Sequence, residues 1–331
     1  MQPIGVVVIG RNEGKRLHQC LLSVASEDAV IVYVDSGSTD GSVALAASLG
    51  VHVIDLDLSI PFTAARSRNV GFEYLVANYP ELAYVQFIDG DCRIASGWLE
   101  RAVNELNSQP DVAVVCGRRR EEFPNYSIYN RLCEIEWNTP VGEAKACGGD
   151  SMMRVSSLKA VGGFNGALIA GEEPELCVRL RQIGGRIIRI NADMTWHDAQ
   201  IKHLSQWWKR LLRSGYAYAQ GAWLHGDKPE RHWVKESLSI WIWGLGIPLV
   251  ALALAGITYG LSLVAAICIY TLSWRKIYVY LRNQGFNPPD AQLYTWNCVL
   301  AKFPQLQGQI QFHIWRLLKR QATLVEYKNI A

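Results

Sequence analysis

Two acidic side chains stand one residue apart directly after a hydrophobic run. Asp89 and Asp91 flank Gly90 and follow residues 84–88, which read Tyr-Val-Gln-Phe-Ile. Glycine lets the backbone bend closely, so both carboxylates can reach one hard cation. Mg²⁺ is typically held in proteins by one or two carboxylates together with substrate phosphates. Asp-Gly is also a common turn dipeptide, so this pattern alone fits a solvated turn equally well.

A second polar cluster ends another apolar run. Residues 30–34 are Val-Ile-Val-Tyr-Val, and residues 35–41 read Asp-Ser-Gly-Ser-Thr-Asp-Gly. The serine, threonine and aspartate at 38–40 are typical helix caps. Asp35 comes too early to be the cap, so we expect its carboxylate to accept hydrogen bonds from a ligand, either a nucleobase or a ribose.

These polar clusters lie within a chain that alternates between strand and helix patterns. Apolar runs at 6–9, 30–34, 51–54 and 84–88 predict strands, and the intervening periodicity predicts helices over 42–49 and 66–76. Further helices are expected over 156–161 and 172–183, followed by a strand over 186–190. The pattern is weak over 122–147, which we expect to be a mobile loop on the acceptor side.

Short apolar strands separated by helices predict an α/β fold with a mixed, mostly parallel sheet covered by helices on both faces. In such sheets, ligands bind beyond the carboxyl ends of the strands. The polar residues that directly follow each strand are therefore the candidate site.

The composition narrows the class of protein. The chain has 331 residues and a net charge of only +3, which argues against nucleic acid as a partner. Its eight cysteines include no CxxC pair, so we expect buried, reduced thiols in a cytosolic compartment. The N-terminus lacks the basic region and cleavage site of a signal peptide. Half the residues are hydrophobic, and the excess lies after Ser237.

An ordered set of short motifs resembles the family 2 glycosyltransferases of the GT-A fold, over about residues 4 to 200. Each motif is weak alone, but their order and spacing match together. The motifs are residues 8–13 (VIGRNE), 34–41 (VDSGSTDG), 65–71 (ARSRNVG), 89–91 (DGD), 162–165 (GGFN), 171–176 (GEEPEL) and 196–198 (WHD).

This resemblance implies a nucleotide-sugar donor, a divalent ion (Mn²⁺ or Mg²⁺) and a role for each matched residue. The donor would be bound by Arg11, Asn12, Glu13, Asp35, Arg68 and Asp89. The metal would be held by Asp91, Asp89 and His197. The general base would be Glu173 or Glu172, because the family usually has Glu-Asp where this chain has Glu-Glu. The extra methylene leaves open which of the two removes the proton.

The mechanism that follows is a single displacement with inversion at the anomeric carbon. The metal stabilises the departing diphosphate, and a carboxylate activates the incoming hydroxyl. A double displacement would need a second, nucleophilic carboxylate, for which the sequence offers no clear candidate. Glu175 is expected to be a solvated helix residue or a first-turn charge favoured by the helix dipole.

The apolar stretches 239–257 and 261–274 predict a two-helix membrane hairpin, spanning or re-entrant, with a kink at Pro248. Basic residues on both flanks place those flanks on the cytoplasmic face of the plasma membrane. A buried hairpin in a soluble protein is the alternative. Residues 207–213 are expected to form an interfacial helix, and 315–320 a surface helix.

Four parts are thus expected: a catalytic domain over 1–200, an amphipathic linker over 201–237, a membrane hairpin over 238–274 and an amphipathic tail over 275–331. The predicted function is metal-dependent, inverting transfer of a sugar to a lipid-linked or polysaccharide acceptor. Transfer to a polyprenyl phosphate is the nearest alternative. A nucleotidyltransferase would need a longer, more basic glycine-rich loop after the first strand, and a non-catalytic membrane scaffold would leave Asp89, Asp91 and Glu173 without a purpose.

Overall fold

The computed structural model describes residues 4–25 and 29–320, and the chain divides into two compact units. The first unit comprises Met1–Phe123 and Glu136–Ala199. The second comprises Pro124–Ile135 and Gln200–Ala331. The segment 124–135 leaves the first unit and returns to it, so the second unit is built from two separate stretches of chain.

A nine-stranded sheet forms the centre of the first unit within the described residues. Its order is β3 (His52–Asp55), β2 (Ala29–Asp35), β1 (Ile4–Gly10), β4 (Tyr84–Asp89), β8 (Ser151–Arg154), β6 (Val112–Glu121), β9 (Arg186–His197) and β5 (Cys92–Ile94), with β7 (Gly142–Glu143) also paired to β9. Parallel ladders join β3, β2, β1 and β4 and join β6 to β9. The short strands β8, β5 and β7 pair antiparallel with their neighbours. The predicted mixed α/β sheet is confirmed.

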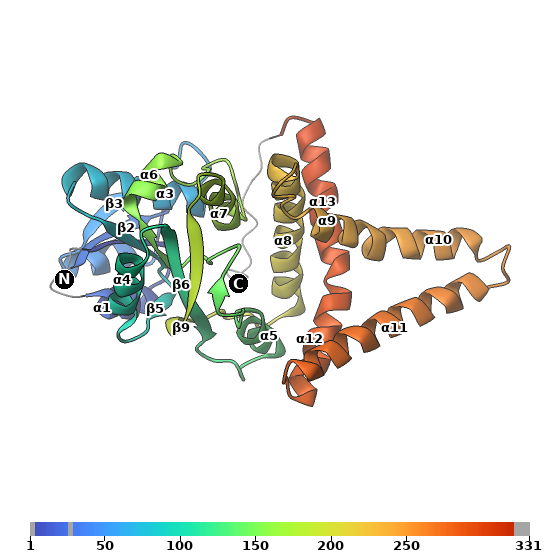
Figure 1. Cartoon of the computed structure of the whole chain (residues 1–331). Helices are drawn as coiled ribbons and strands as arrows, with labels where there is room; N and C mark the ends of the chain where they lie inside the picture. The colour runs from blue at the N-terminus through green and yellow to red at the C-terminus, as the bar shows by residue number, and fades with distance from the viewer. Residues whose placement is uncertain (1–3, 26–28, 321–331) are drawn as a thin grey trace. The chain divides into compact units, whose positions relative to one another are not determined.

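Helices cover both faces of this sheet. They are α1 (Lys15–Val24), α2 (Ser42–Ser48), α3 (Ala64–Asn78), α4 (Trp98–Ser108), α6 (Val155–Ala160) and α7 (Glu172–Gln182) (Figure 1). Side chains alternate along β4, because successive strand residues point to opposite faces. On one face, the Phe87 ring packs edge-on against Phe164, with ring centroids 5.1 Å apart. On the other face, Gln86 accepts a hydrogen bond from the Trp98 indole of α4.

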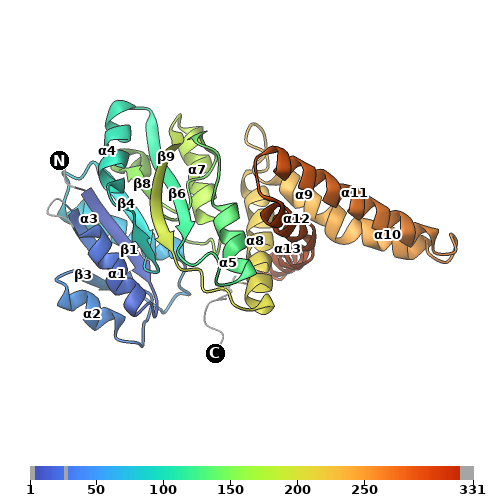
Figure 2. The same ribbon diagram turned by 90° about the horizontal axis from the view of Figure 1, so that it is seen from below.

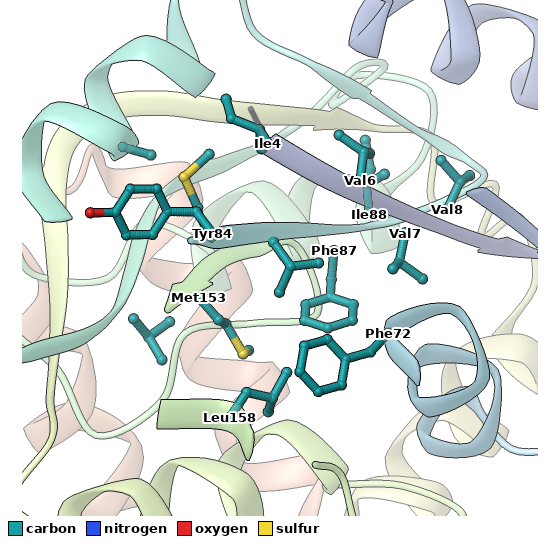
Figure 3. Close-up of a cluster of buried hydrophobic side chains, with 14 of the residues drawn as sticks. Ile4, Val6, Val7, Val8, Phe72, Tyr84, Phe87, Ile88, Met153 and Leu158 are labelled. Atoms are coloured by element: carbon teal, nitrogen blue, oxygen red, sulfur yellow. The ribbon is translucent and has the colours of Figure 1, made fainter. Parts of the chain in front are cut away.

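The core follows from the same alternation. Figure 3 shows Val7 and Phe87 on the side of Phe72 and Leu158, which belong to α3 and α6, while Val6 lies on the opposite side of β1. The continuous apolar runs that predicted buried strands are therefore buried on both faces.

The second unit is helical within the described residues. It contains α5 (Ile128–Glu136), α8 (Leu204–His225), α9 (Val234–Trp241), the π-helical turn η1 (Ile242–Gly246), α10 (Ile247–Leu254), α11 (Leu261–Asn283), α12 (Pro288–Leu300) and α13 (Lys302–Leu317) (Figure 2). The expectation that residues 122–147 form only a loop was wrong, because α5 lies within them. With nine residues, α5 is too short to give a strong periodic signal.

Helices α8 and α13 approach each other at backbone distance. A Cβ on Gly215 would stand 2.0 Å from the Gln305 carbonyl, and one on Gly308 would stand 2.0 Å from the Leu212 carbonyl. Tyr216 and Phe312 then pack edge-to-face across the same contact, with ring centroids 5.3 Å apart. Residues 315–317 of the expected surface helix at 315–320 are therefore the end of a helix that buries one face, and residues 318–320 lie beyond it.

The helical hairpin consists of α10 and α11, which form a V that closes at their connection in Figure 1. The Ser262 hydroxyl donates a hydrogen bond to the Ala251 carbonyl at 2.7 Å and ties the two helices together near their connection. The π-helical turn η1 ends at Gly246, two residues before Pro248, which has no N–H to continue the ladder. Within the described residues, Val234–Leu254 is the one helix long and apolar enough to cross a membrane.

Candidate active site

The pair Asp89 and Asp91 lies at the carboxyl end of β4, which runs between β1 and β8. The Asp89 N–H donates to Asp150 Oδ1 at 3.0 Å. The Asp91 side chain turns toward β9, where its Oδ2 lies 3.4 Å from His197 Nε2. The two carboxylates predicted to act together therefore leave the strand end in different directions.

Arg68 of α3 bridges two carboxylates on the Asp89 side. Its Nη2 donates to Asp89 Oδ1 at 2.8 Å, and its Nη1 donates to Glu172 Oε1 at 2.7 Å. Burial opposes the charge on Arg68, but the carboxylates of Asp89 and Glu172 outweigh it and raise the pKa of the guanidinium. Arg68 is thus a permanent cation that joins the end of β4 to the start of α7.

Asp150 and Arg119 complete this side of the site, and the sequence patterns singled out neither of them. Asp150 is fully buried, and its Oδ2 accepts hydrogen bonds from Arg119 Nε at 2.8 Å and Thr195 Oγ1 at 2.8 Å. Arg119 Nη2 also lies 3.4 Å from Asp89 Oδ2. Burial works against the Arg119 cation, yet Asp150 and Asp89 raise its pKa.

Gly149 lets the chain pass close to these charges. A Cβ at this position would stand 2.7 Å from Arg68 Nη2 and 3.3 Å from Asp89 Oδ2. Any side chain here would displace the ion-paired groups. The Gly-Gly pair before Asp150 therefore makes room for the Arg68–Asp89 pair.

His197 is positioned at the end of β9 by two neighbouring strands. Cys92 of β5 and Glu121 of β6 are its register partners. Glu121 Oε2 lies 3.8 Å from His197 Nδ1, and the Trp137 ring packs edge-on at 4.8 Å. The Glu121 carboxylate thus lies behind one ring nitrogen, beyond hydrogen-bond distance, while the other ring nitrogen faces Asp91.

The donor set around Asp91 suits a divalent ion. Asp91 and His197 offer a carboxylate oxygen and an imidazole nitrogen, both largely buried, with Glu121 behind the imidazole. The ligand atoms of Asp91, Cys92 and His197 all lie within 4.8 Å of one another, and so do those of Asp89, Cys92 and Asp150. Burial, followed by the charge of Asp150, raises the pKa of the Cys92 thiol, so it stays protonated. Asp89, Asp91 and His197 thus gather around Cys92.

Asp35 and Asn12 belong to a separate network that joins two loops. The buried Asp35 carboxylate accepts hydrogen bonds from the Tyr33 hydroxyl at 2.7 Å and from the N–H groups of Gly37 and Ser38 at 2.9 and 2.7 Å. Asn12 Oδ1 accepts from the Thr39 N–H at 2.7 Å. In this structure both side chains organise the loops after β1 and β2.

The neighbours of Asn12 also have protein contacts. The Arg11 guanidinium lies over the Phe62 ring at 5.0 Å, and Glu13 pairs with Arg16 at 2.6 Å. These residues line the ends of β1 and α1, the edge at which donor binding was expected.

Glu172 and Glu173 begin α7 but face different partners. Glu172 binds Arg68, as described above. Glu173 Oε1 accepts hydrogen bonds from the Cys147 N–H and from Cys177 Sγ, the latter at 3.2 Å. Its Oε2 has no hydrogen-bond partner within residues 4–25 and 29–320.

Glu175 was expected to be either a solvated helix residue or a first-turn charge, and it is not solvated. It is 3% exposed, and both of its oxygens bind Arg179, with Oε2 2.7 Å from Nη2. Arg179 in turn donates to the Val161 and Gly163 carbonyls, so the pair fastens α7 to the turn after α6.

Comparisons with solved structures identify the class of fold. A mannosyltransferase from Pyrobaculum calidifontis, solved with GDP-Man and Mn²⁺, aligns with 96% of this chain and 88% of its own at a TM-score of 0.62 and 15% identity. Residues 1–349 of TarS from S. aureus align with 94% of this chain and 91% of their own at a TM-score of 0.51 and 14% identity. The chain has the GT-A fold of glycosyltransferases.

Sequence comparisons place the chain within that class. Residues 5–160 match the model of glycosyl transferase family 2. A pre-mycofactocin glycosyltransferase from Mycobacterium tuberculosis is 25% identical over 97% of this chain and 67% of its own length. Glycosyltransferase AglE from Haloferax volcanii is 25% identical over 55% of this chain and 62% of its own. Residues 5–160 therefore match a glycosyl transferase family 2 domain, and the protein is a glycosyltransferase.

Proposed function

We propose that this enzyme transfers a sugar from a nucleoside-diphosphate sugar to a hydroxyl of a lipid-linked or polysaccharide acceptor, with inversion and with a divalent ion, Mn²⁺ or Mg²⁺. The observation that carries the proposal is the 3.4 Å approach of Asp91 Oδ2 to His197 Nε2, supported from behind by Glu121. The mannosyltransferase of similar fold was solved with GDP-Man and Mn²⁺, which supports the same class of donor and ion here.

Asp91 and His197 would hold the ion, with Asp89 nearby as its neighbour at the strand end. When bound, the ion neutralises the negative charge that develops on the departing diphosphate. Asp89 is engaged by Arg68 and Arg119, at 2.8 and 3.4 Å. We therefore assign Asp89 mainly to donor binding, where the two fixed cations offset the carboxylates of the pocket.

The remaining donor contacts are assigned to the loops after β1 and β2. Arg11, Asn12, Glu13 and Asp35 lie in or beside these loops, and the Asn12–Thr39 bond holds the two loops together. Loops at the carboxyl ends of neighbouring parallel strands are the usual nucleotide-binding edge of an α/β sheet.

Glu173 is the better candidate for the general base. Glu172 binds the Arg68 cation at 2.7 Å, which stabilises its ionised form and weakens it as a proton acceptor. Glu173 is held through Oε1 alone, so Oε2 is available to take the proton from the acceptor hydroxyl. The hydroxyl oxygen then attacks the anomeric carbon as the bond to the diphosphate breaks, and one such displacement inverts the configuration.

The direct test is a screen of the purified chain in detergent against nucleotide-sugars, with release of nucleoside diphosphate as the readout. We expect release from one donor with Mn²⁺ and loss of release with chelator. In that assay Glu173→Gln should lower kcat by about 10²–10⁴-fold, the usual contribution of a general base, with little change in donor KM. If Glu172→Gln is inactive while Glu173→Gln is active, the general base is Glu172 instead.

The hairpin supports a membrane as partner, with the enzyme on its cytoplasmic face beside lipid-linked acceptors. Large apolar side chains on α10, α11 and their connection are exposed, among them Leu249, Val250, Leu252, Ile257, Leu261, Val264, Ile267 and Leu272. Exposed apolar surface of this kind marks a membrane or protein contact. Basic residues flank the hairpin on both sides, which is typical of cytoplasmic flanks.

Flotation with phosphatidylethanolamine and phosphatidylglycerol vesicles tests this partner. The wild-type chain should float with the vesicles, and a Leu252→Asp, Ile267→Asp double variant should remain in the soluble fraction. Ile183→Asp, an exposed apolar position in the first unit, is the control and should float like wild type. Equal flotation of all three chains would contradict the proposal that the hairpin contacts the membrane.

A further inference from the structure

Two cysteines surround the carboxylate to which we assign proton abstraction. Cys147 lies in the loop before Asp150, and Cys177 lies one turn after Glu173 on α7. Their sulfurs are 3.6 Å apart, and Cys177 Sγ is 3.2 Å from Glu173 Oε1. All three ligand atoms lie within 4.8 Å of one another, and all three residues are buried.

These separations are close to those of a tetrahedral zinc site. With Zn–S bonds of about 2.3 Å and Zn–O bonds of about 2.0–2.2 Å, a tetrahedral ion places two sulfurs about 3.8 Å apart and a sulfur and an oxygen about 3.5 Å apart. The observed 3.6 and 3.2 Å need only small adjustments. A disulfide would instead require the two sulfurs to close to about 2.05 Å.

The ligand chemistry separates this cluster from the Asp91–His197 pair. Thiolates select zinc over hard ions, whereas carboxylate, imidazole and phosphate oxygen suit Mn²⁺. Two cysteines and one carboxylate also leave the fourth position of a tetrahedral ion open to water or to an acceptor hydroxyl. The chain therefore offers two places that prefer different ions.

We propose that Cys147, Glu173 and Cys177 form a binding site for Zn²⁺, and that zinc bound there inhibits transfer by occupying the carboxylate of Glu173. The first half concerns binding alone. The second half rests on the proposed function, because inhibition follows only if Glu173 is the base.

Binding is tested with Co²⁺ as a probe of the full chain in detergent. Thiolate ligation gives sulfur-to-cobalt charge-transfer absorption, which we expect in the wild-type chain and which an equivalent of Zn²⁺ should abolish. Cys147→Ser and Cys177→Ser should lose the absorption, whereas Cys92→Ser should keep it. Cys92 is the matched control because it is also a buried thiol beside carboxylates. Its sulfur lies within 4.8 Å of the ligand atoms of Asp91 and His197, and within 4.8 Å of those of Asp89 and Asp150. Wild-type chain without this absorption, or its loss in Cys92→Ser alone, overturns the site.

Inhibition is tested separately, with nucleoside diphosphate release at saturating Mn²⁺. The zinc concentration that inhibits the wild-type chain should be at least about 10–100-fold lower than the concentration that inhibits Cys177→Ser. Even the loss of a group that only supports a metal ligand lowers metal affinity by about that factor. Exposed Cys268→Ser is the control and should be inhibited like wild type. If cobalt absorption locates the ion at the two cysteines but zinc leaves transfer unchanged, the inhibitory half and the assignment of Glu173 as base both fail. If the absorption is absent while Glu173→Gln is inactive, the zinc site fails and the proposed function stands.

Discussion

Replacing Asp150 by asparagine removes one charge from a buried ion pair of the site and keeps the shape of the side chain. Asp150 is fully buried and takes two hydrogen bonds from Arg119, through Nε at 2.8 Å and Nη2 at 2.5 Å. In Asp150→Asn the Arg119 cation keeps only Asp89, at 3.4 Å. Asparagine can still accept the Asp89 N–H through Oδ1, so the loss falls on the two groups that donate to Oδ2, Arg119 and Thr195.

Breaking a buried pair by removing one partner costs about 3–5 kcal/mol, because the other charge is left uncompensated. The remaining Asp89 contact places this change near the lower limit, about 3 kcal/mol. For a domain of about 150–250 residues, 1 kcal/mol corresponds to about 2–4 °C in melting temperature, so we expect a decrease of about 6–12 °C.

Differential scanning calorimetry of the purified chain measures this decrease. Asp111→Asn is the matched control, because Asp111 pairs with Arg186 at 3.0 Å on the surface, where both side chains are exposed and solvent screens the pair. We expect the control to melt like wild type. Equal melting temperatures for Asp150→Asn and Asp111→Asn would refute the assignment of Asp150 as the buried counter-ion of Arg119.

Two further predictions address the loop beside the site and the second unit. Gly149→Ala places a Cβ 2.7 Å from Arg68 Nη2, so Arg68 must move away from Asp89. We expect kcat/KM to fall by about 10²-fold, because a displacement of about 1 Å near the reacting groups costs that much. An unchanged kcat/KM would contradict the close approach of Gly149 to Arg68. Asp290 binds the Arg131 guanidinium, which holds the pKa of that carboxyl below its ordinary value of 3.8. The ion pair therefore stabilises the chain above that pH and is lost as the pH falls through the depressed pKa. Asp290→Asn should melt below wild type at pH 7. The difference should shrink as the pH falls below about 4 and vanish below the depressed pKa; a difference that is constant with pH would exclude the ion pair as its cause.

The strands and the strand-end site could be predicted because they depend on local pattern and a general rule of topology. Runs such as 30–34 are apolar throughout, and parallel strands bring their carboxyl ends to one edge. That rule brings Asp89, Asp91 and His197 together around Cys92, although these residues come from two distant parts of the chain.

Asp150 and Arg119 could not be found in the same way. Arg119 stands in a run of three arginines, and an irregular register between β6 and β9 decides which one turns toward Asp150. Asp150 precedes a four-residue strand that pairs antiparallel, so the topology rule for parallel strands does not reach it. The positions of both residues depend on how strands distant in the sequence pair, and the local hydrophobic pattern carries no information about that pairing.

The neighbours of Glu173 were hidden by the ordinary behaviour of cysteine. Scattered cysteines were expected to be core hydrophobes, and Cys147 and Cys177 are indeed buried. Their approach to one carboxylate follows from the path of the loop before Asp150 against α7, which the sequence does not specify. The sequence likewise left Glu172 and Glu173 equivalent, and only their different partners, Arg68 and the two cysteines, distinguish them.

The account depends above all on Asp91 and His197 holding one divalent ion against the donor diphosphate. Electron paramagnetic resonance measures free Mn²⁺ directly, so a titration of the chain with Mn²⁺ and nucleoside diphosphate gives the affinity without any transfer. We expect Asp91→Asn and His197→Ala to lose at least about 10–100-fold in Mn²⁺ affinity, with the exposed Asp57→Asn unchanged. Wild-type affinity in Asp91→Asn would contradict the metal assignment.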